Sequence, residues 1–236
     1  MLLFFMGSIF IKGKTMKTLE KNNYEKGVDV SKWQGNIKWN EVINDGIKHA
    51  FIKMTEGGTY TDPQFVANWN AAKKTGISVG AYHYFRGASS TPEEQTENIR
   101  KNLTSIAFDT TKDWLAIDVE KRGNESVTPD AMADNLQNLL TRIKRDVLPN
   151  FDVIIYCSSG YWDSGVNWKK YDFSVHRLWV AHWNVEKPRL PKTWDKPGTT
   201  WFWWQHSSKG HVQGIQGEVD LDWVNTPSTN SYCSIL

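Results

Sequence analysis

The octapeptide Asp113-Trp-Leu-Ala-Ile-Asp-Val-Glu120 is the stretch around which the fold is organised. Its composition predicts a buried β-strand that ends in two acids. Side chains alternate along a strand, so Asp118 and Glu120 project to the same side, with Cα atoms about 6.6 Å apart at roughly 3.3 Å per residue. The opposite face is apolar and consists of Leu115, Ile117 and Val119. A carboxyl pair at this range suits glycosidic-bond cleavage, in which one acid protonates a leaving oxygen. The alternative interpretation is a strand end that carries two solvated acids.

Length and composition are compatible with one large domain or two small ones, and barrels of the (β/α)8 kind often have this length as single domains. The 236 residues are 39% hydrophobic, which is enough for a core, and the formal net charge of +2 gives no reason to expect nucleic acid. Thirteen tryptophans are many for this length, and their flat apolar faces suit a carbohydrate groove. Cys157 and Cys233 make no disulfide framework, and Cys157 reads as a small buried hydrophobe. The six histidines lack paired spacing, so we expect neither a metal ion nor a cofactor.

Eight apolar segments, each ending in polar or aromatic residues, predict eight strands. They are residues 27–33, 49–56, 78–85, 113–120, 151–157, 177–183, 200–206 and 218–224. Helical patterns separate the first five. Thr91-Pro-Glu-Glu94 resembles a capping box, and Thr128-Pro129 opens a long amphipathic helix. After the fifth strand the helical signal fades, and Tyr161 to Ser174 is more typical of a loop.

This order of elements predicts an α/β fold, an irregular (β/α)8 TIM-like parallel barrel whose helices are weak or missing in the last third. An open doubly wound sheet is the structural alternative. No glycine-rich phosphate loop follows the first strand, which disfavours that alternative. We expect the barrel to occupy residues 26–225, between an N-terminal segment (1–25) and a polar C-terminal tail (226–236).

Both ends of the chain carry signals that admit two interpretations. Met1 to Ile11 is apolar but too short to span a bilayer; it is either a secretion signal or untranslated sequence before a start at Met16. Cys233-Ser-Ile-Leu236 matches a prenylation box, for which chance is the better account.

In barrels of this class, active sites are built at the carboxyl ends of the strands. Those ends are unusually acidic and aromatic here. Like charges gathered on one rim cost stability, so a cluster of acids there indicates a functional site. Within the seventh strand, alternation puts Trp201 and Trp203 on one face and Phe202 and Trp204 on the other. We expect Trp204 and Gln205 near the barrel mouth and Trp203 in the outward-packing set.

Six motifs in order along the chain resemble glycoside hydrolase family 25, the CH-type lysozymes or N-acetylmuramidases. They are Gly27-Val-Asp-Val-Ser31, Val79-Gly-Ala-Tyr-His-Tyr-Phe85, Asp118-Val-Glu120, Leu178-Trp-Val-Ala181, Trp204-Gln205 and Val219-Asp-Leu221. The resemblance implies an irregular barrel that cuts the β-1,4 bond between N-acetylmuramic acid and N-acetylglucosamine. Carried over by motif, Glu120 is the general acid/base and Asp118 its partner. The substrate-binding set is Asp29, Tyr82, Tyr156, Trp183, Gln205 and Asp220, of which Tyr156 fits its motif loosely.

The resemblance also implies a mechanism and a setting. The substrate's 2-acetamido group attacks the anomeric carbon, giving retention without a protein nucleophile. We expect a monomer, secreted or released, that acts on peptidoglycan glycan strands without stable membrane insertion and binds no nucleic acid. Two alternatives stay open: a family 18-like chitinase or N-acetylglucosaminidase, and a catalytically inactive wall-binding barrel. A His83–Cys157 pairing is a weaker enzymatic alternative. Phage endolysin, secreted lysozyme and antibacterial effector all remain open as settings.

Overall fold

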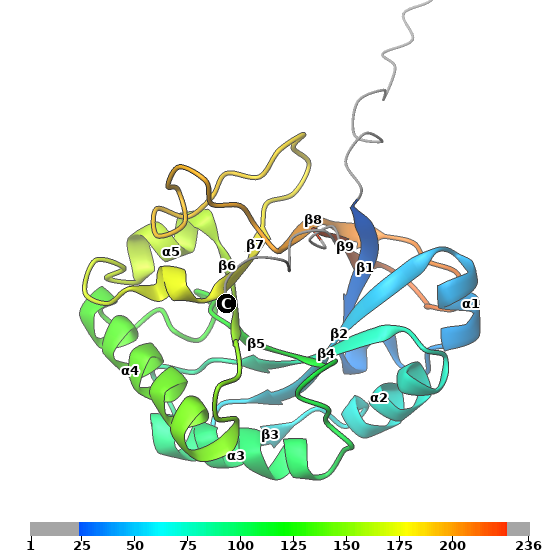
Figure 1. Cartoon of the computed structure of the whole chain (residues 1–236), viewed down its shortest axis with the longest axis horizontal. Helices are drawn as coiled ribbons and strands as arrows, with labels where there is room; N and C mark the ends of the chain where they lie inside the picture. Colours follow the sequence, from blue (N-terminus) through cyan, green and yellow to red (C-terminus); the bar gives the residue numbers. More distant parts are fainter. Residues whose placement is uncertain (1–23, 226–236) are drawn as a thin grey trace, which may run out of the picture.

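Eight strands close into a barrel, and a short ninth strand extends one edge (Figure 1). The computed structural model describes residues 24–225. The strands run in chain order as follows: β1 (Glu25–Val30), β2 (Ile47–Glu56), β3 (Tyr60–Thr61), β4 (Ser78–Tyr84), β5 (Trp114–Asp118), β6 (Ile154–Ser158), β7 (Arg177–Ala181), β8 (Trp203–Gly210) and β9 (Val219–Val224). The barrel closes because β1 pairs with β2 on one side and with β9 on the other. This arrangement confirms the predicted barrel and excludes the open sheet.

The barrel is mixed rather than wholly parallel. Neighbours from β1 through β2, β4, β5, β6 and β7 to β8 are parallel, but β9 is antiparallel to both β8 and β1. The expectation of eight parallel strands was therefore wrong for the last one. Only residues 211–218 join β8 to β9, and a parallel return needs a crossover of a dozen residues or more.

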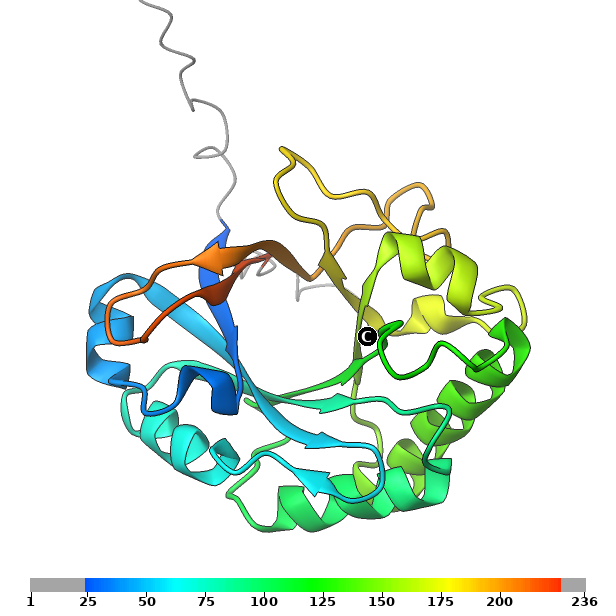
Figure 2. The same ribbon diagram turned by 180° about the vertical axis from the view of Figure 1, so that it is seen from behind.

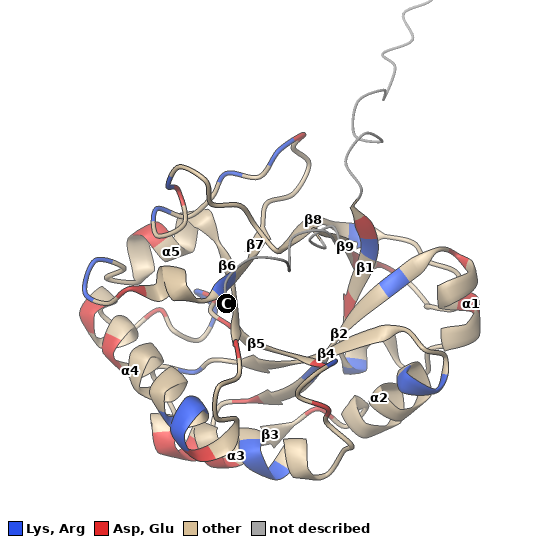
Figure 3. Cartoon of the chain, viewed as in Figure 1, with Lys and Arg blue, Asp and Glu red and all other residues tan. Residues whose placement is uncertain are grey.

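Helices cover the outside of the barrel around its first strands, and the described chain after Gly165 forms no further α-helix, as predicted for the last third. They are α1 (Trp39–Asn44), α2 (Phe65–Lys74), α3 (Pro92–Thr104), α4 (Pro129–Arg142) and α5 (Ser159–Gly165), with short turns of other helix types at η2 (Lys32–Gln34), η3 (Ile143–Val147) and η4 (Phe173–Val175). Between β7 and β8 the described chain forms a long loop without a helix, visible from both sides of the molecule (Figures 1 and 2). Acidic and basic residues both lie along the covering helices (Figure 3).

Capping side chains mark the first turns of three of these helices. The Thr91 side chain accepts from the Glu94 N–H and completes the predicted capping box of α3. The Thr128 side chain accepts from the Ala131 N–H at the start of α4. The loop expected from Tyr161 onward is wrong for its first residues, because Ser158 caps the short helix α5 and compensates for its two glycines.

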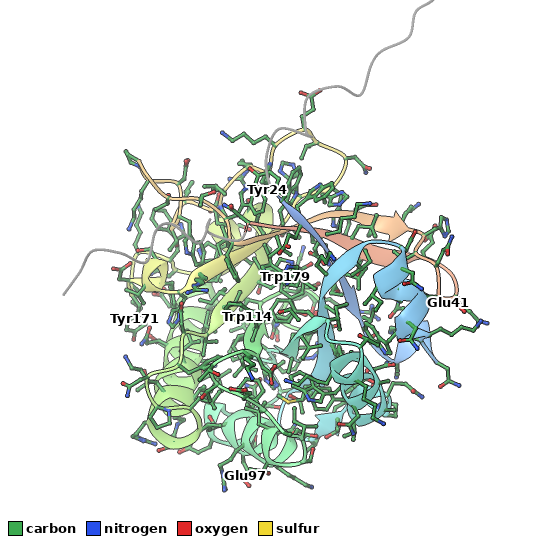
Figure 4. All side chains as sticks on the ribbon, turned by 45° about the vertical axis from the view of Figure 1, so that its right-hand side comes forward. Tyr24, Glu41, Glu97, Trp114, Tyr171 and Trp179 are labelled. Carbon is green, nitrogen blue, oxygen red and sulfur yellow. The ribbon has the colours of Figure 1, made fainter. Side chains whose placement is uncertain are left out.

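Two hydrophobic cores lie on the two faces of the sheet. The core between barrel and helices is largely aliphatic and receives Leu115 and Ile117 of β5, whereas Ala116 points into the barrel, as strand alternation predicted. The barrel interior is aromatic, and Figure 4 shows Trp179 and Trp114 near the centre of the molecule. Aromatic rings fill the narrow interior below the mouth, so the site above it has a rigid floor.

Strand β8 departs from the predicted alternation. Phe202 and Trp203 both pack inside the barrel, and Trp201 and Trp204 both pack outside it. The placements expected for Trp203 and Trp204 were therefore wrong. The cause is a bend at Phe202, where the regular strand has not yet begun; β8 starts at Trp203. Gln205 faces the mouth as expected.

The terminal signals cannot be compared with the structure. The apolar N-terminal segment and the Cys233 box lie outside the described residues. None of the helices within residues 24–225 has the length and apolar character that a membrane span requires.

Candidate active site

A cleft of about 350 Å³ opens at the carboxyl ends of the parallel strands. It brings together every residue that the sequence singled out for the site: Asp29, Tyr82, Asp118, Glu120, Tyr156, Trp183, Gln205 and Asp220. Six of these residues lie on six different strands, and Glu120 and Trp183 lie in the segments that follow β5 and β7. Residues at the ends of barrel strands converge on one mouth, whereas unrelated surface acids would be scattered.

Asp118 and Glu120 form a carboxyl pair at the end of β5. Asp118 is the last residue of the strand, and its carbonyl accepts from the Phe85 N–H. Glu120 lies two residues beyond, where the Asn124 side chain donates to its carbonyl at 2.9 Å and fixes the backbone. The two carboxyl groups share a side-chain hydrogen bond. Oδ1 of Asp118 is buried and has no hydrogen-bond partner among the described residues.

This pair holds protons more tightly than isolated acids do. Burial raises the pKa of Asp118, and the negative charge of Glu120 raises it further. Burial also raises the pKa of Glu120, against the hydrogen bond from Asp118 and the charges of Lys53, Arg122 and Arg86, which lower it. The hydrogen bond between them raises the pKa of Asp118 and lowers that of Glu120, so Asp118 is the donor of the pair. The pair can therefore deliver one proton to a ligand.

A cationic network borders the pair on the β2 and β4 side. The Glu56 carboxylate accepts from Lys53 Nζ at 2.7 Å and from Arg86 Nε at 2.9 Å, and Arg86 makes a second contact through its terminal nitrogen. These two cations lower the pKa of Glu56 against the opposing effect of burial. Tyr84 lies between them, with Lys53 Nζ and Arg86 Cζ each 4.8 Å from its ring centroid. Lys53 is thereby held over the cleft.

A second acid cluster lies across the mouth, where β1 meets β9. Asp29 pairs in register with Asp220, and Asp222 follows on the same face of β9. Burial raises the pKa of all three, Asp220 to about 6 and Asp222 to about 8. The charges of Asp220 and Asp222 raise the pKa of Asp29 further. Protonation of this cluster relieves the like-charge repulsion of five acids on one rim.

Gln205 connects the cluster to the aromatic wall of the cleft. Its amide donates to Asp29 Oδ2 at 2.7 Å, and its carbonyl accepts from Tyr156 Oη at 3.0 Å and Trp183 Nε1 at 2.9 Å. Trp183 is nevertheless 47% exposed, so one face of its ring is open to a ligand. The Tyr156 hydroxyl is thus part of the cleft, although its sequence motif matched loosely.

Three residues of the site escaped the sequence analysis. Asp222 was signalled by alternation along β9, which places it beside Asp220. Lys53 lies within β2, three residues before the strand's last residue, so strand ends did not point to it. Trp179 lines the floor of the cleft and donates to Asp222 Oδ1 at 2.8 Å; only the closure of the barrel brings it there.

The proposed cysteine–histidine pairing does not form. His83 is buried between Thr55 Oγ1 at 2.8 Å and Gln95 Oε1 at 3.0 Å, and burial lowers its pKa to about 4. Cys157 is buried in the outer core. Among residues 24–225, no group of three or more His, Cys, Asp or Glu residues has the geometry to hold a metal ion.

Known proteins share this sequence pattern and fold. The model of the family described as glycosyl hydrolases family 25 matches residues 28–215. Lysozyme M1 of Streptomyces globisporus is 30% identical over 202 residues, covering 85% of this chain and 67% of the relative. The crystal structure of a bacterial lysozyme from Streptomyces coelicolor matches with a TM-score of 0.76 and 31% identity, covering 86% of this chain and 92% of that one. A family 25 glycosyl hydrolase from Bacillus anthracis matches with a TM-score of 0.72 and 26% identity, covering 94% and 96% of the two chains.

Proposed function

The chain belongs to family 25 of the glycosyl hydrolases, and from this premise we propose that it is a muramidase, a lysozyme-type enzyme. It hydrolyses the β-1,4 bond between N-acetylmuramic acid and N-acetylglucosamine in peptidoglycan. The observation that carries the proposal is the coupled Asp118–Glu120 carboxyl pair in an open cleft. The similarity to two Streptomyces lysozymes supports the same substrate. The enzyme acts as a monomer on the cell wall, outside the cytoplasm.

Glu120 is the general acid and base. It lies beyond the strand end and is less buried than Asp118, so a leaving oxygen can reach it. Burial raises its pKa, which favours the protonated form that a general acid requires. After departure of the leaving sugar, the same carboxylate activates water.

Asp118 orients the acetamide of N-acetylmuramic acid. Its unpartnered Oδ1 is a buried acceptor beside the cleft, and an acetamide N–H is the donor that fits it. When that N–H binds, the carboxylate form of Asp118 is favoured, so the shared proton passes to Glu120. Asp118 then stabilises the positive oxazolinium ion that forms when the acetamide oxygen attacks the anomeric carbon. No protein nucleophile is needed, and the configuration is retained.

Two variants test these roles. Glu120→Gln removes the proton donor and should lower kcat by roughly 10²–10⁴-fold. Asp118→Asn should be severely impaired, and azide should not rescue it as a glycosyl azide of inverted configuration. Release of reducing sugar from purified cell walls and from chitin is the assay. Glu97→Gln is the control, because Glu97 lies on the outer surface of α3 (Figure 4).

The products decide between the alternatives. Reducing N-acetylmuramic acid ends from walls, without products from chitin, are expected; release from chitin identifies a chitinase, and no release identifies a binding module. NMR of the first-formed anomer on a defined muropeptide oligomer tests the mechanism. An initial β-anomer supports retention through the acetamide. An initial α-anomer overturns that mechanism while leaving the muramidase assignment intact.

A further inference from the structure

A second pocket of about 650 Å³ adjoins the catalytic cleft. It shares part of its wall with the cleft, including Lys53, Tyr84 and Arg122, so a branched ligand in the cleft can reach into it. We call it the side pocket. Its charged residues are Lys32, Lys53, Glu56, Asp62, Arg86 and Arg122.

The positive charge of the side pocket is only partly neutralised. Glu56 is already occupied by Lys53 and Arg86. The Asp62 carboxylate accepts backbone N–H groups, including that of Lys32 at 3.0 Å. No carboxylate within the described residues pairs with the Lys32 ammonium group, which instead lies over the rings of Trp33 and Tyr60, at 5.1 and 5.3 Å from their centroids. Lys32 is thus positioned by two rings and free to bind an anion.

The rest of the groove does not offer this environment. The cleft is lined by four acidic side chains and only two basic ones. The pocket on the other flank, next to Trp183, has two acidic residues, Glu120 and Glu125, and two basic ones, Lys121 and Arg122. An anionic group on the substrate therefore has one favourable destination, the side pocket.

We propose that the side pocket binds a carboxylate on the lactyl branch of N-acetylmuramic acid, with Lys32 as its direct partner. This inference rests on the proposed function, in which the 2-acetamido group lies against Asp118. The lactyl ether is attached to the next ring carbon, so the branch starts beside Asp118.

Strand register supports this direction of the branch. Asp118 is opposite Tyr84 on β4, and Tyr84 is opposite Glu56 on β2. Neighbouring strands lie about 4.8 Å apart, so the wall of the side pocket begins about one strand spacing from Asp118. The carboxylate has two chemical sources: the lactyl group itself in a peptide-free glycan, or a free carboxyl group of the attached stem peptide.

Three soluble substrates and one variant test the proposal. The substrates are glycan strands with intact stem peptides, the same strands with all carboxyl groups converted to amides, and strands from which an amidase has removed the peptides. Lys32→Gln should raise KM about 3- to 10-fold on intact strands without a change in kcat, and Lys32→Arg should restore KM. On the amidated strands, wild type and Lys32→Gln should have equal KM values. Lys48→Gln is the matched control, because Lys48 is an exposed lysine near the other end of β2.

The outcomes separate the possible failures. A KM increase on intact strands alone identifies a carboxyl group of the stem peptide, one on peptide-free strands alone identifies the lactyl carboxylate, and one on both shows that the side pocket accepts either; all three support the proposal. An unchanged KM on both intact and peptide-free strands, or an equal increase on amidated strands, overturns it. If the wild type releases no reducing N-acetylmuramic acid ends from any of the three substrates, the proposed function fails instead.

Discussion

Two buried tryptophans in the barrel interior should respond differently to the same substitution. Trp203 and Trp179 are 1% and 2% exposed, and each ring lies 4.5 Å from the ring centroid of Phe51, Trp179 stacked on it and Trp203 edge-on. The Trp203 N–H is buried without an acceptor among the described residues, whereas the Trp179 N–H donates to Asp222. The two tryptophans therefore match in burial and in distance from Phe51, and they differ in the hydrogen bonding of the indole N–H.

We predict that Trp203→Phe lowers the free energy of unfolding by about 0–1.5 kcal/mol, because the lost ring volume is offset by removal of an unsatisfied donor. Trp179→Phe should cost about 2–4 kcal/mol, because it leaves the buried Asp222 carboxyl group without its indole partner. Trp203→Ala should cost about 3–5 kcal/mol as a core truncation.

Urea unfolding and thermal melting measure these differences. At about 2–4 °C per kcal/mol for a chain of this size, Trp179→Phe should melt roughly 4–8 °C below Trp203→Phe. Trp33→Ala is the control, since Trp33 is 81% exposed and its truncation should leave the melting temperature unchanged. Equal losses for the two Phe variants would refute the reasoning, as would a Trp203→Ala variant that keeps the wild-type melting temperature.

Two further perturbations probe the site's electrostatics and its floor. Burial raises the pKa of Asp222 to about 8, so the stability that its proton contributes is complete below the unfolded pKa of about 3.9 and is lost as pH rises toward 8. Between pH 5 and 8 the wild type should lose up to about 1.4 kcal/mol more per pH unit than Asp222→Asn, and parallel urea-unfolding profiles would contradict this. A Cβ at Gly80 would lie 2.2 Å from the Phe51 ring, so Gly80→Ala should cost about 1–3 kcal/mol in the same assay. Gly160→Ala places no heavy atom within 4 Å of its new Cβ and should leave the free energy of unfolding unchanged. Equal losses for the two glycine variants would show that the Phe51 ring moves aside without cost.

Strand periodicity and helix caps made most of the fold predictable. The apolar segments alternate or run continuously over the length of single strands, and Thr91 and Thr128 are local signals that act within one turn. Such information is read from a few neighbouring residues. The bend at Phe202 is different, because the Phe202 N–H bonds to Leu178 of the neighbouring strand. A local sequence pattern cannot include that contact, so the predicted alternation of side chains continued through the bend at Phe202, where it does not hold.

The predicted site residues line one cleft because strand ends and family motifs pointed to the same rim. The supporting network was not predictable in this way. The Glu56–Arg86 ion pair joins residues thirty positions apart, and the Trp179–Asp222 hydrogen bond joins residues forty-three positions apart. These pairs exist only because β2 adjoins β4 and because β9 closes the barrel. Neither strand pairing can be predicted from neighbouring residues in the sequence.

Asp220 shows that the direction of a strand decides which of its ends faces the cleft. It is the second residue of β9, so in a parallel barrel it would lie near the closed end, far from Glu120. The antiparallel direction of β9 reverses this and places the start of the strand at the mouth, where Asp220 pairs with Asp29 near the end of β1. The family motif identified the residue, and the short connection from β8 explains why the strand must run that way. The same reversal brings Asp222 underneath Asp29 with a raised pKa. The mouth can therefore hold five carboxyl groups, because the strand that adds two of them also buries one deeply enough to keep it protonated.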